Sequence, residues 1–298
     1  MQKKYLMLDL EGLELTPAER EILAYPQVYG VVLFARNYAN KKQLKKLTVS
    51  IKEINHGLLI GVDHEGGRVQ RFQTEFTVIP AASEFGDLYD KDPEVAEKQL
   101  EVAAQTVAQE LKDVGIDINF APVLDLDYGK NSAIGNRSFS GDKNIVAALG
   151  KIYVQELEGY GIKTVAKHFP GHGYAIADSH VEFATDARDY QSIAENDLCP
   201  FQEVVKQGIF GIMPAHVVYA AVDKNAAGFS QYWLRDILRD SLKFKGTIFS
   251  DDLNMFAASS VGDMSVRVNR ALEAGCDVVL ICNNREGVLQ TLEENLCN

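Results

Sequence analysis

The chain has 298 residues, 46% of them hydrophobic, which is enough for a large core and fits two domains or one α/β barrel. Its formal net charge of −12 argues against a nucleic-acid partner, because phosphate binding needs clustered lysine and arginine. No run approaches the roughly 20 apolar residues that span a bilayer, and the N-terminal MQKKYLMLDLEG is too poor in apolar residues for a signal peptide.

Short apolar runs alternate with longer amphipathic segments along the chain. The predicted strands are residues 5–10, 30–34, 58–62, 116–121, 164–168, 209–213, 246–249 and 277–281. Helices are predicted after the capping sequence Thr16-Pro17-Ala18-Glu19, over about residues 41–54, 93–114, 144–160, 192–206, 232–242 and 266–274, and briefly at the end. Eight strands alternating with eight helices favour an α/β fold of the single-domain (β/α)8 TIM-barrel type over an open doubly wound sheet.

The domain organisation follows from this count. We expect one catalytic domain over residues 1–298, with a C-terminal helical end that is short or truncated, because the chain stops soon after the eighth strand. No internal repeat or linker-like stretch divides the chain, and no GxGxxG follows the first strand, which weakens a dinucleotide-binding interpretation.

The four cysteines have neither the paired spacing of a metal site nor the density of a disulfide framework. Cys276 and Cys282 flank the apolar run DVVLI, so we expect both thiols to be reduced and in or near the core. Reduced thiols favour a cytoplasmic location. We also expect no membrane partner.

One stretch, residues 163–180, concentrates three of the six histidines directly beside a predicted strand. Lys167 and His168 end that strand. Asp178 and His180 lie one residue apart farther along, so that they could share a hydrogen bond. Such a density of titratable side chains favours a functional loop over a plain surface turn.

The turn inside this stretch consists of Pro170, Gly171 and Gly173, with His172 between the two glycines. We expect the glycines to give the following loop freedom to move. We expect His172 to hold the turn as a structural residue.

Polar side chains follow other predicted strands too, at the edge where such barrels hold their active sites. These residues are Arg36, Asn37, Asp63, Asp125, Arg137, Lys167, His168, His216 and Asp251. A polar residue at one strand end could merely satisfy loop backbone groups. The same pattern after six strands indicates one shared site.

Asp251 directly follows the seventh predicted strand, in GTIFSDDLNM, and is suited to attack a sugar carbon as a covalent nucleophile. The neighbouring Asp252 is suited to capping the next helix. His180, oriented by Asp178, could donate a proton to a leaving oxygen and later take one from water.

The remaining rim residues are suited to holding a sugar. Asp63, Lys167 and His168 can bind hydroxyl groups through charge-assisted hydrogen bonds. Arg71 and Arg137 offer planar donors for hydroxyl, carbonyl or carboxylate oxygens.

Five motifs, in order, resemble glycoside hydrolase family 3, and more narrowly its bacterial β-N-acetylhexosaminidases of peptidoglycan recycling. The motifs are DHEGGRVQRF, GNRSFSGD, KHFPGHG with DSH shortly after, MPAH and GTIFSDDL. The resemblance implies a (β/α)8 barrel with Asp251 as nucleophile and the Asp178–His180 pair as acid/base. The substrate-binding residues it implies are Asp63, Arg71, Arg137, Lys167 and His168.

The activity implied by the resemblance is that of a retaining exo-β-N-acetylglucosaminidase. Its substrate would be a small carbohydrate, a muropeptide with N-acetylglucosamine linked to anhydro-N-acetylmuramic acid. No cofactor or metal is implied, and we expect a monomer. His64 stands where relatives of this branch commonly have glutamine, and we expect no effect on the chemistry. The roles of His64 and Glu65 stay open, and Arg68 is expected to make structural ion pairs.

Three alternatives stay open. A metal-dependent hydrolase could use a ligand set at the barrel mouth made of His168, His172, His180, His216 and Asp251. The Pro-Gly turn between the first two of these histidines removes the i,i+4 spacing of a helical metal motif. A family 3 glycosidase of other sugar specificity and a sugar-binding protein without catalysis are the other two.

Overall fold

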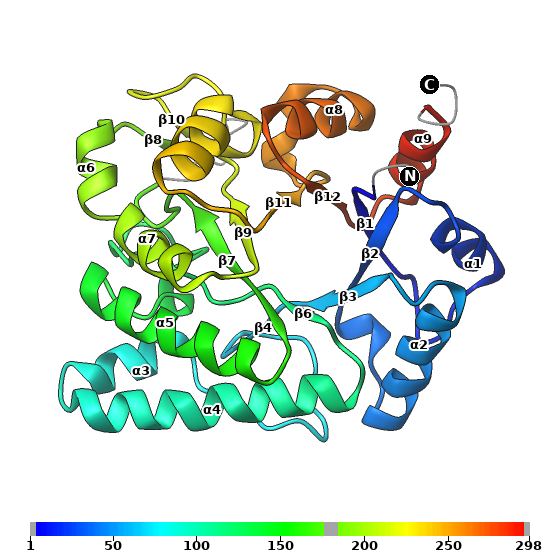
Figure 1. The fold of residues 1–298 in the computed structure, drawn as a ribbon, viewed down its shortest axis with the longest axis horizontal. Coiled ribbons are helices and arrows are strands. Elements are labelled where there is room, and N and C mark those ends of the chain that lie inside the picture. Colours follow the sequence, from blue (N-terminus) through cyan, green and yellow to red (C-terminus); the bar gives the residue numbers. More distant parts are fainter. Residues whose placement is uncertain (1–3, 176–183, 295–298) are drawn as a thin grey trace.

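The computed structural model describes residues 4–175 and 184–294. At its centre is a closed barrel of parallel strands in the order β1-β12-β11-β9-β7-β6-β3-β2 (Figure 1). The barrel strands are β1 (Leu6–Asp9), β2 (Val28–Leu33), β3 (Leu59–Val62), β6 (Ile118–Asn119), β7 (Lys163–Phe169), β9 (Gly211–Pro214), β11 (Thr247–Asp252) and β12 (Val278–Ile281). Each strand lies beside the next barrel strand of the chain and β12 closes onto β1, so the predicted (β/α)8 fold is confirmed.

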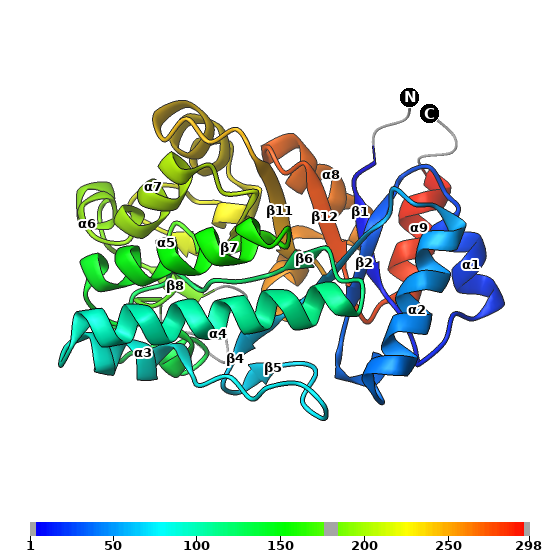
Figure 2. The same ribbon diagram turned by 60° about the horizontal axis from the view of Figure 1, so that its bottom comes forward.

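Helices surround the barrel, with α1, α2 and α9 on one side and α4, α5 and α7 on the other in both views (Figures 1 and 2). Their bounds are α1 (Pro17–Leu23), α2 (Lys41–Ile54), α4 (Pro93–Asp113), α5 (Lys143–Gly159), α7 (Leu198–Gln207), the π-helix η4 (Tyr232–Ser241), α8 (Met264–Ala274) and α9 (Arg285–Glu294). Helix α1 begins with the predicted capping box, in which Thr16 and Glu19 each accept a hydrogen bond from the other's backbone N–H. None of the helices in the described ranges is both long and apolar enough to cross a bilayer.

The helix predicted over residues 192–206 is two helices, α6 (Tyr190–Glu195) and α7. Pro200 lies in the first turn of α7 and has no N–H to donate to the carbonyl group of Asn196. A proline is tolerated there but does not continue a preceding helix, so the chain interrupts the helical run before it.

Several short elements were not predicted. They are the hairpin of β4 (His64–Gly66) and β5 (Val69–Gln70), α3 (Ala82–Tyr89), the parallel pair β8 (Ala184–Asp186) and β10 (Val217–Tyr219), and the 3-10 turns η1 (Ala35–Asn37), η2 (Gly135–Arg137), η3 (Ala227–Phe229) and η5 (Phe256–Val261). All except α3 and η5 have only two or three residues, too few to show a hydrophobic period.

The core has two layers, because alternate strand residues point to opposite faces. In β1, Met7 belongs to the cluster that fills the barrel, whereas Leu6 and Leu8 belong to the layer between barrel and helices. Cys282 lies in the inner cluster and Cys276 in the outer one, each 2% exposed, as expected from their positions beside β12.

Candidate active site

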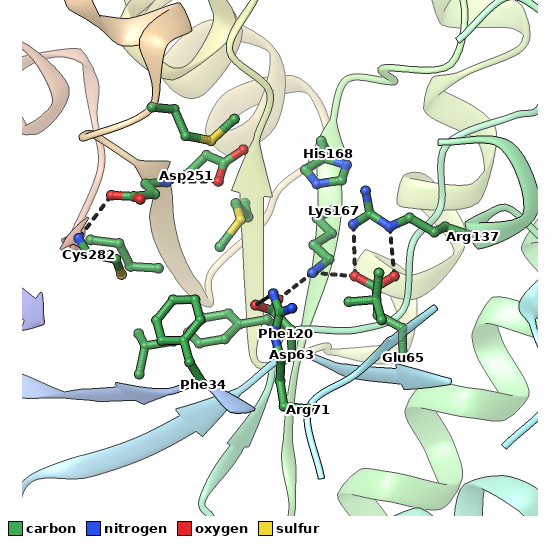
Figure 3. A pocket seen from close by; sticks show the side chains of 16 residues that line it. Phe34, Asp63, Glu65, Arg71, Phe120, Arg137, Lys167, His168, Asp251 and Cys282 are labelled. Carbon is green, nitrogen blue, oxygen red and sulfur yellow. Dashed lines mark hydrogen bonds and ion pairs between the residues drawn. The ribbon is translucent and has the colours of Figure 1, made fainter. Parts of the chain in front are cut away.

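A cavity of about 280 Å³ lies at the carboxyl ends of the barrel strands. Its polar lining residues are Asp63, Glu65, Arg71, Arg137, Lys167, His168, Asp251 and Asp252. Its apolar lining residues are Val32, Phe34, Val69, Phe120, Met213, Met255, Leu280 and Cys282. Six residues predicted to bind or attack the substrate therefore converge on one cavity (Figure 3). The predicted acid/base pair, Asp178 and His180, lies outside the described residues.

Lys167 is the centre of a charged network on one wall of this cavity (Figure 3). Its Nζ lies 2.7 Å from Asp63 Oδ1 and 2.7 Å from Glu65 Oε1. Asp63 also accepts a hydrogen bond from Arg71 Nη2 at 3.1 Å, and Glu65 accepts two from Arg137, both at 2.8 Å. Three cations thus alternate with two carboxylates, and the wall carries a net positive charge.

The network keeps its groups ionised although it is buried. Burial raises the pKa of Asp63, but the charges and hydrogen bonds of Lys167 and Arg71 outweigh it and lower that pKa to about 2. The pKa of Glu65 is also lowered, because Lys167 and Arg137 outweigh burial. Conversely, the two carboxylates outweigh burial and raise the pKa of Lys167. At neutral pH the wall therefore presents fixed charges to a ligand.

Glu65, whose role the sequence left open, belongs to the site, and residue spacing could have indicated this. In an extended segment alternate side chains point to the same side, so Asp63 and Glu65 both face the cavity. His64 between them is only 1% exposed and packs against Phe72 and Phe76 instead. Burial there lowers its pKa to about 3, so its imidazole is neutral.

His168 is held by Asp125, which lies behind it and is itself fully buried. Asp125 Oδ2 lies 2.7 Å from His168 Nδ1, while Oδ1 accepts backbone hydrogen bonds from His168 and His172. Burial raises the pKa of Asp125, but the imidazole of His168 outweighs it and the pKa is lowered. A carboxylate beside Nδ1 places the proton on that nitrogen and leaves Nε2 for a ligand.

Asp251 is the last residue but one of β11 and faces the cavity from a different side than Lys167 and Asp63 (Figure 3). Its Oδ1 accepts a hydrogen bond of 2.8 Å from the backbone N–H of Asp252. The carboxylate is partly exposed, so it is open to a substrate in the cavity.

The prediction that Asp252 caps the next helix is wrong. Its Oδ1 accepts hydrogen bonds from the backbone of Asn254 and Cys282, which ties β11 to the end of β12. The cap of α8 is Asp263, whose side chain accepts from Val266 N. Burial, with the neighbouring Asp251, raises the pKa of Asp252 to about 6.

Other predicted rim residues lie outside the cavity lining and support loops. Asn37 donates to the carbonyl oxygens of Leu10 and Gly12, and Arg36 pairs with Asp9. Among the described residues the exposed guanidinium of Arg68, which we expected to make ion pairs, donates to Asn136 and to backbone carbonyl oxygens. Those carbonyls belong to Ser132, Ala133 and Ile134.

The described histidines of the ligand set for a metal-dependent hydrolase each have a separate partner. His168 Nδ1 faces Asp125, His172 Nδ1 lies 2.9 Å from Asn131 Nδ2, and His216 Nε2 lies 3.2 Å from the carbonyl oxygen of Asp252. Within residues 4–175 and 184–294, no group of three or more His, Cys, Asp or Glu side chains could hold a metal ion.

Gly171 and Gly173, which we expected to give the following loop freedom to move, both lie where a side chain would meet neighbouring atoms. A Cβ on Gly171, whose φ is +139°, would lie 2.6 Å from Asp197 Cβ. A Cβ on Gly173 would lie 1.8 Å from the carbonyl oxygen of Leu126. Both glycines therefore allow close packing of the turn after β7, and Asn131 fastens the same turn by donating to the carbonyl oxygens of His172 and Ala175.

Gly173→Ala is expected to lower the free energy of unfolding by about 1–3 kcal/mol, because backbone must move to admit the methyl group. The measurement is unfolding in denaturant. Gly159→Ala is the matched control, since no atom lies within 4 Å of its Cβ position. Equal stabilities of the two variants would contradict the assignment of close packing to Gly173.

Known proteins similar to this chain share its whole barrel. The family described as Glycosyl hydrolase family 3 N terminal domain matches residues 2–298. A "Beta-hexosaminidase" of Methylobacillus flagellatus is 50% identical over 279 residues, covering 93% of this chain and 80% of that protein. A "Beta-hexosaminidase" of Hydrogenovibrio crunogenus is 49% identical, covering 94% and 78%. The crystal structure of NagZ from Neisseria gonorrhoeae in complex with N-trifluoroacetyl-D-glucosamine is 42% identical, with a TM-score of 0.93, covering 98% of this chain and 85% of that one.

Proposed function

This chain belongs to glycosyl hydrolase family 3 and is an enzyme of the β-hexosaminidase type, and we propose that it is a retaining exo-β-N-acetylglucosaminidase. The proposed substrate is a peptidoglycan-derived muropeptide, in which terminal N-acetylglucosamine is β-linked to anhydro-N-acetylmuramic acid. The observation that supports the proposal most is a partly exposed carboxylate, Asp251, facing the same cavity as the Asp63–Lys167–Glu65 network. The N-acetylglucosamine analogue bound by the gonococcal relative supports the choice of sugar.

Sugar binding is assigned to the charged wall. Asp63, Lys167 and His168 hold hydroxyl groups. The hydrogen bonds of Lys167 to Asp63 and of His168 to Asp125 keep these side chains fixed before substrate arrives. Arg71 and Arg137 supply further donors from either end of the network. Glu65 is a positioning residue, because its carboxylate is occupied by Lys167 and Arg137.

Catalysis proceeds in two displacements. A carboxylate oxygen of Asp251 attacks the anomeric carbon, the bond to the leaving oxygen breaks, and protonated His180 gives its proton to that oxygen. Water then loses a proton to His180 and attacks the anomeric carbon, which frees Asp251 and releases the sugar with its configuration kept. Asp178 orients His180 and stabilises its protonated form.

Hydrolysis of 4-nitrophenyl N-acetyl-β-glucosaminide is expected to exceed that of the matching glucoside and xyloside by at least about 100-fold in kcat/KM. The physical reason is that a site which binds the amide group of the sugar leaves buried polar atoms unpaired when the substrate lacks that group. Comparable turnover of the glucoside would favour a family 3 glycosidase of other specificity. Proton NMR of the first-formed product should show the β anomer, and an initial α anomer would contradict retention.

The natural substrate is tested with the disaccharide itself. Release of free N-acetylglucosamine from GlcNAc-anhydroMurNAc, followed by mass spectrometry, is the expected result. Binding without release would favour a sugar-binding protein. We also propose that the enzyme is a cytoplasmic monomer, and the free thiols of Cys199, Cys276 and Cys282 support the location.

A further inference from the structure

Asp251, the proposed nucleophile, lies in an irregular part of β11. The register between β11 and β12 shifts over the residues that lead up to Asp252. Side-chain oxygens of β11 accept hydrogen bonds here from the backbone of β12. Ser250 Oγ accepts from the N–H of Leu280 at 3.0 Å, and Asp252 Oδ1 accepts from that of Cys282 at 3.0 Å. An irregular register re-aims the side chains around it, so the direction of Asp251 depends on how its neighbours are held.

The backbone of Asp252 connects the carboxylate of Asp251 to a buried imidazole. The N–H of Asp252 donates to Asp251 Oδ1 at 2.8 Å. The carbonyl oxygen of Asp252 lies 3.2 Å from Nε2 of His216, a residue of the MPAH sequence between β9 and β10. Rotation of the Asp252 backbone would move the N–H group that holds the carboxylate, and the bond to His216 opposes that rotation.

His216 is itself held firmly by the barrel. Its side chain is buried, and its ring stacks on that of Phe229, with centroids 5.6 Å apart and planes 13° from parallel. The preceding residue, Ala215, is bound on both sides. Its N–H donates to the carbonyl oxygen of Phe169 at 2.8 Å, and its carbonyl oxygen accepts from Gly228 at 3.2 Å. The imidazole is therefore a fixed point from which the Asp252 backbone can be held.

The chemistry of the ring agrees with a single donor role. A carbonyl oxygen only accepts, so the proton lies on Nε2 of His216. Burial lowers the pKa of His216, and the charge of Asp251 opposes burial only in part, so the ring is neutral at pH 7. The other nitrogen, Nδ1, is buried and has no hydrogen-bond partner in the described part of the chain. An unpaired buried nitrogen lowers stability, so packing alone gives no reason for a histidine here.

We propose that His216 is a positioning residue for the reaction, whose Nε2–H group holds the Asp252 backbone and so aims the Asp251 carboxylate at the anomeric carbon. The proposal rests on the proposed function, in which Asp251 is the nucleophile. His216 is not among the described residues that line the cavity, so it acts through Asp252 and not on the sugar. Nucleophilic attack needs close and aligned atoms, so a small displacement of the carboxylate slows it strongly.

His216→Leu is the test variant, because it removes the donor and keeps an apolar side chain against Phe229. The measured quantity is the rate constant at which saturating 5-fluoro N-acetylglucosaminyl fluoride labels Asp251, followed by mass spectrometry of the intact protein. Fluoride leaves with little help from an acid, so labelling reports the attack itself. We expect this rate constant to fall by about 10- to 100-fold. The Kd of N-acetylglucosamine, measured by calorimetry, should stay within about 3-fold of the wild-type value, because the charged wall is left intact.

His216→Gln should restore labelling to within about 3-fold of the wild-type rate, because its amide keeps an N–H donor near the place of Nε2. A role in packing alone would not distinguish glutamine from leucine in this way. His216→Asn is the second variant if His216→Leu does not fold. Its amide is one carbon shorter and does not reach the Asp252 carbonyl, so it should slow labelling as the leucine does.

Thr48→Val is the matched control, because it also takes a buried donor away from a backbone carbonyl oxygen. Thr48 in α2 is 2% exposed, and its hydroxyl donates to the carbonyl oxygen of Val114 at 2.6 Å. It too is absent from the described lining of the cavity. This variant should lose about as much free energy of unfolding as His216→Leu, while Asp251 is labelled at the wild-type rate.

Three results would overturn the positioning role of His216 alone, with the wild-type enzyme labelled on Asp251. They are labelling at the wild-type rate in the folded leucine or asparagine variant, equal slowing in the glutamine variant or in Thr48→Val, and a loss of N-acetylglucosamine binding as large as the loss of labelling. No label on Asp251 in the wild-type enzyme would overturn the nucleophile of the proposed function, and this proposal with it.

Discussion

Asp251→Ala is expected to lower kcat by on the order of 10³-fold or more while leaving the fold intact, because the covalent step loses its nucleophile. The carboxylate is partly exposed near the end of β11 and accepts a backbone hydrogen bond at 2.8 Å from Asp252. Truncation therefore leaves no buried charge without a partner. Steady-state turnover of 4-nitrophenyl N-acetyl-β-glucosaminide, with circular dichroism for the fold, is the measurement.

Asp252→Asn is the matched control for this prediction. An asparagine side chain keeps an oxygen acceptor for the backbone N–H groups of Asn254 and Cys282. We expect kcat within about 10-fold of the wild-type value, since that group makes no bond to the substrate in the proposed mechanism. Wild-type turnover in Asp251→Ala, or equal losses in the two variants, would remove the nucleophile assignment.

Lys167→Met is expected to lower the free energy of unfolding by about 3–5 kcal/mol, the usual cost of removing one partner of a buried ion pair. The Lys167 side chain is 4% exposed, and its loss leaves Asp63 and Glu65 facing each other without the cation between them. Turnover should fall as well, because the sugar-binding wall loses its fixed geometry. Denaturant unfolding at pH 7 measures the first effect.

This loss of stability has a predictable pH dependence. In the wild type the pKa of Asp63 is lowered to about 2, and that of Glu65 is lowered too. Both carboxylates therefore contribute to the free energy of unfolding above their unfolded pKa of about 4, and this contribution is lost as pH falls through the folded pKa values. Without Lys167, both folded pKa values lie higher than in the wild type, because Arg71 and Arg137 alone then oppose burial. The difference in free energy of unfolding between variant and wild type should therefore stay constant near pH 7 and narrow as pH falls below about 4.

The control for Lys167 is the exposed pair of Lys151 and Glu203, whose nitrogen and oxygen lie 3.4 Å apart with side chains 46% and 31% exposed. Lys151→Met should change the free energy of unfolding by less than about 1 kcal/mol. If the difference in free energy of unfolding between Lys167→Met and the wild type stays constant with pH, the ion-pair explanation is contradicted.

The barrel could be predicted from the sequence because its strands are short apolar runs that need burial on both faces. The strand before Lys167 and His168 and the one before Asp251 are examples, and both lie where they were expected. The pair β8–β10 could not be predicted, since it joins only three residues from each of two distant segments of the chain. The domain bounds, residues 1–298, stay a prediction.

The site was predictable where one residue's place at a strand end defines its position, as for Asp63 and Asp251. It was not predictable where partners come together through the fold. Glu65 pairs with Arg137, 72 residues later, and Asp125 lies behind His168 with no local pattern to show it. The roles of Asp178 and His180 stay predictions that kinetics must test.

The most direct test of the central claim is covalent trapping of the sugar on the enzyme. A 5-fluoro N-acetylglucosaminyl fluoride slows hydrolysis of a glycosyl-enzyme more than its formation, so intact-protein mass spectrometry should show one added fluorosugar. Peptide mapping should place that sugar on Asp251. Turnover of the inhibitor with no adduct, or an adduct on another residue in a folded enzyme, would contradict the assignment of Asp251 as the nucleophile.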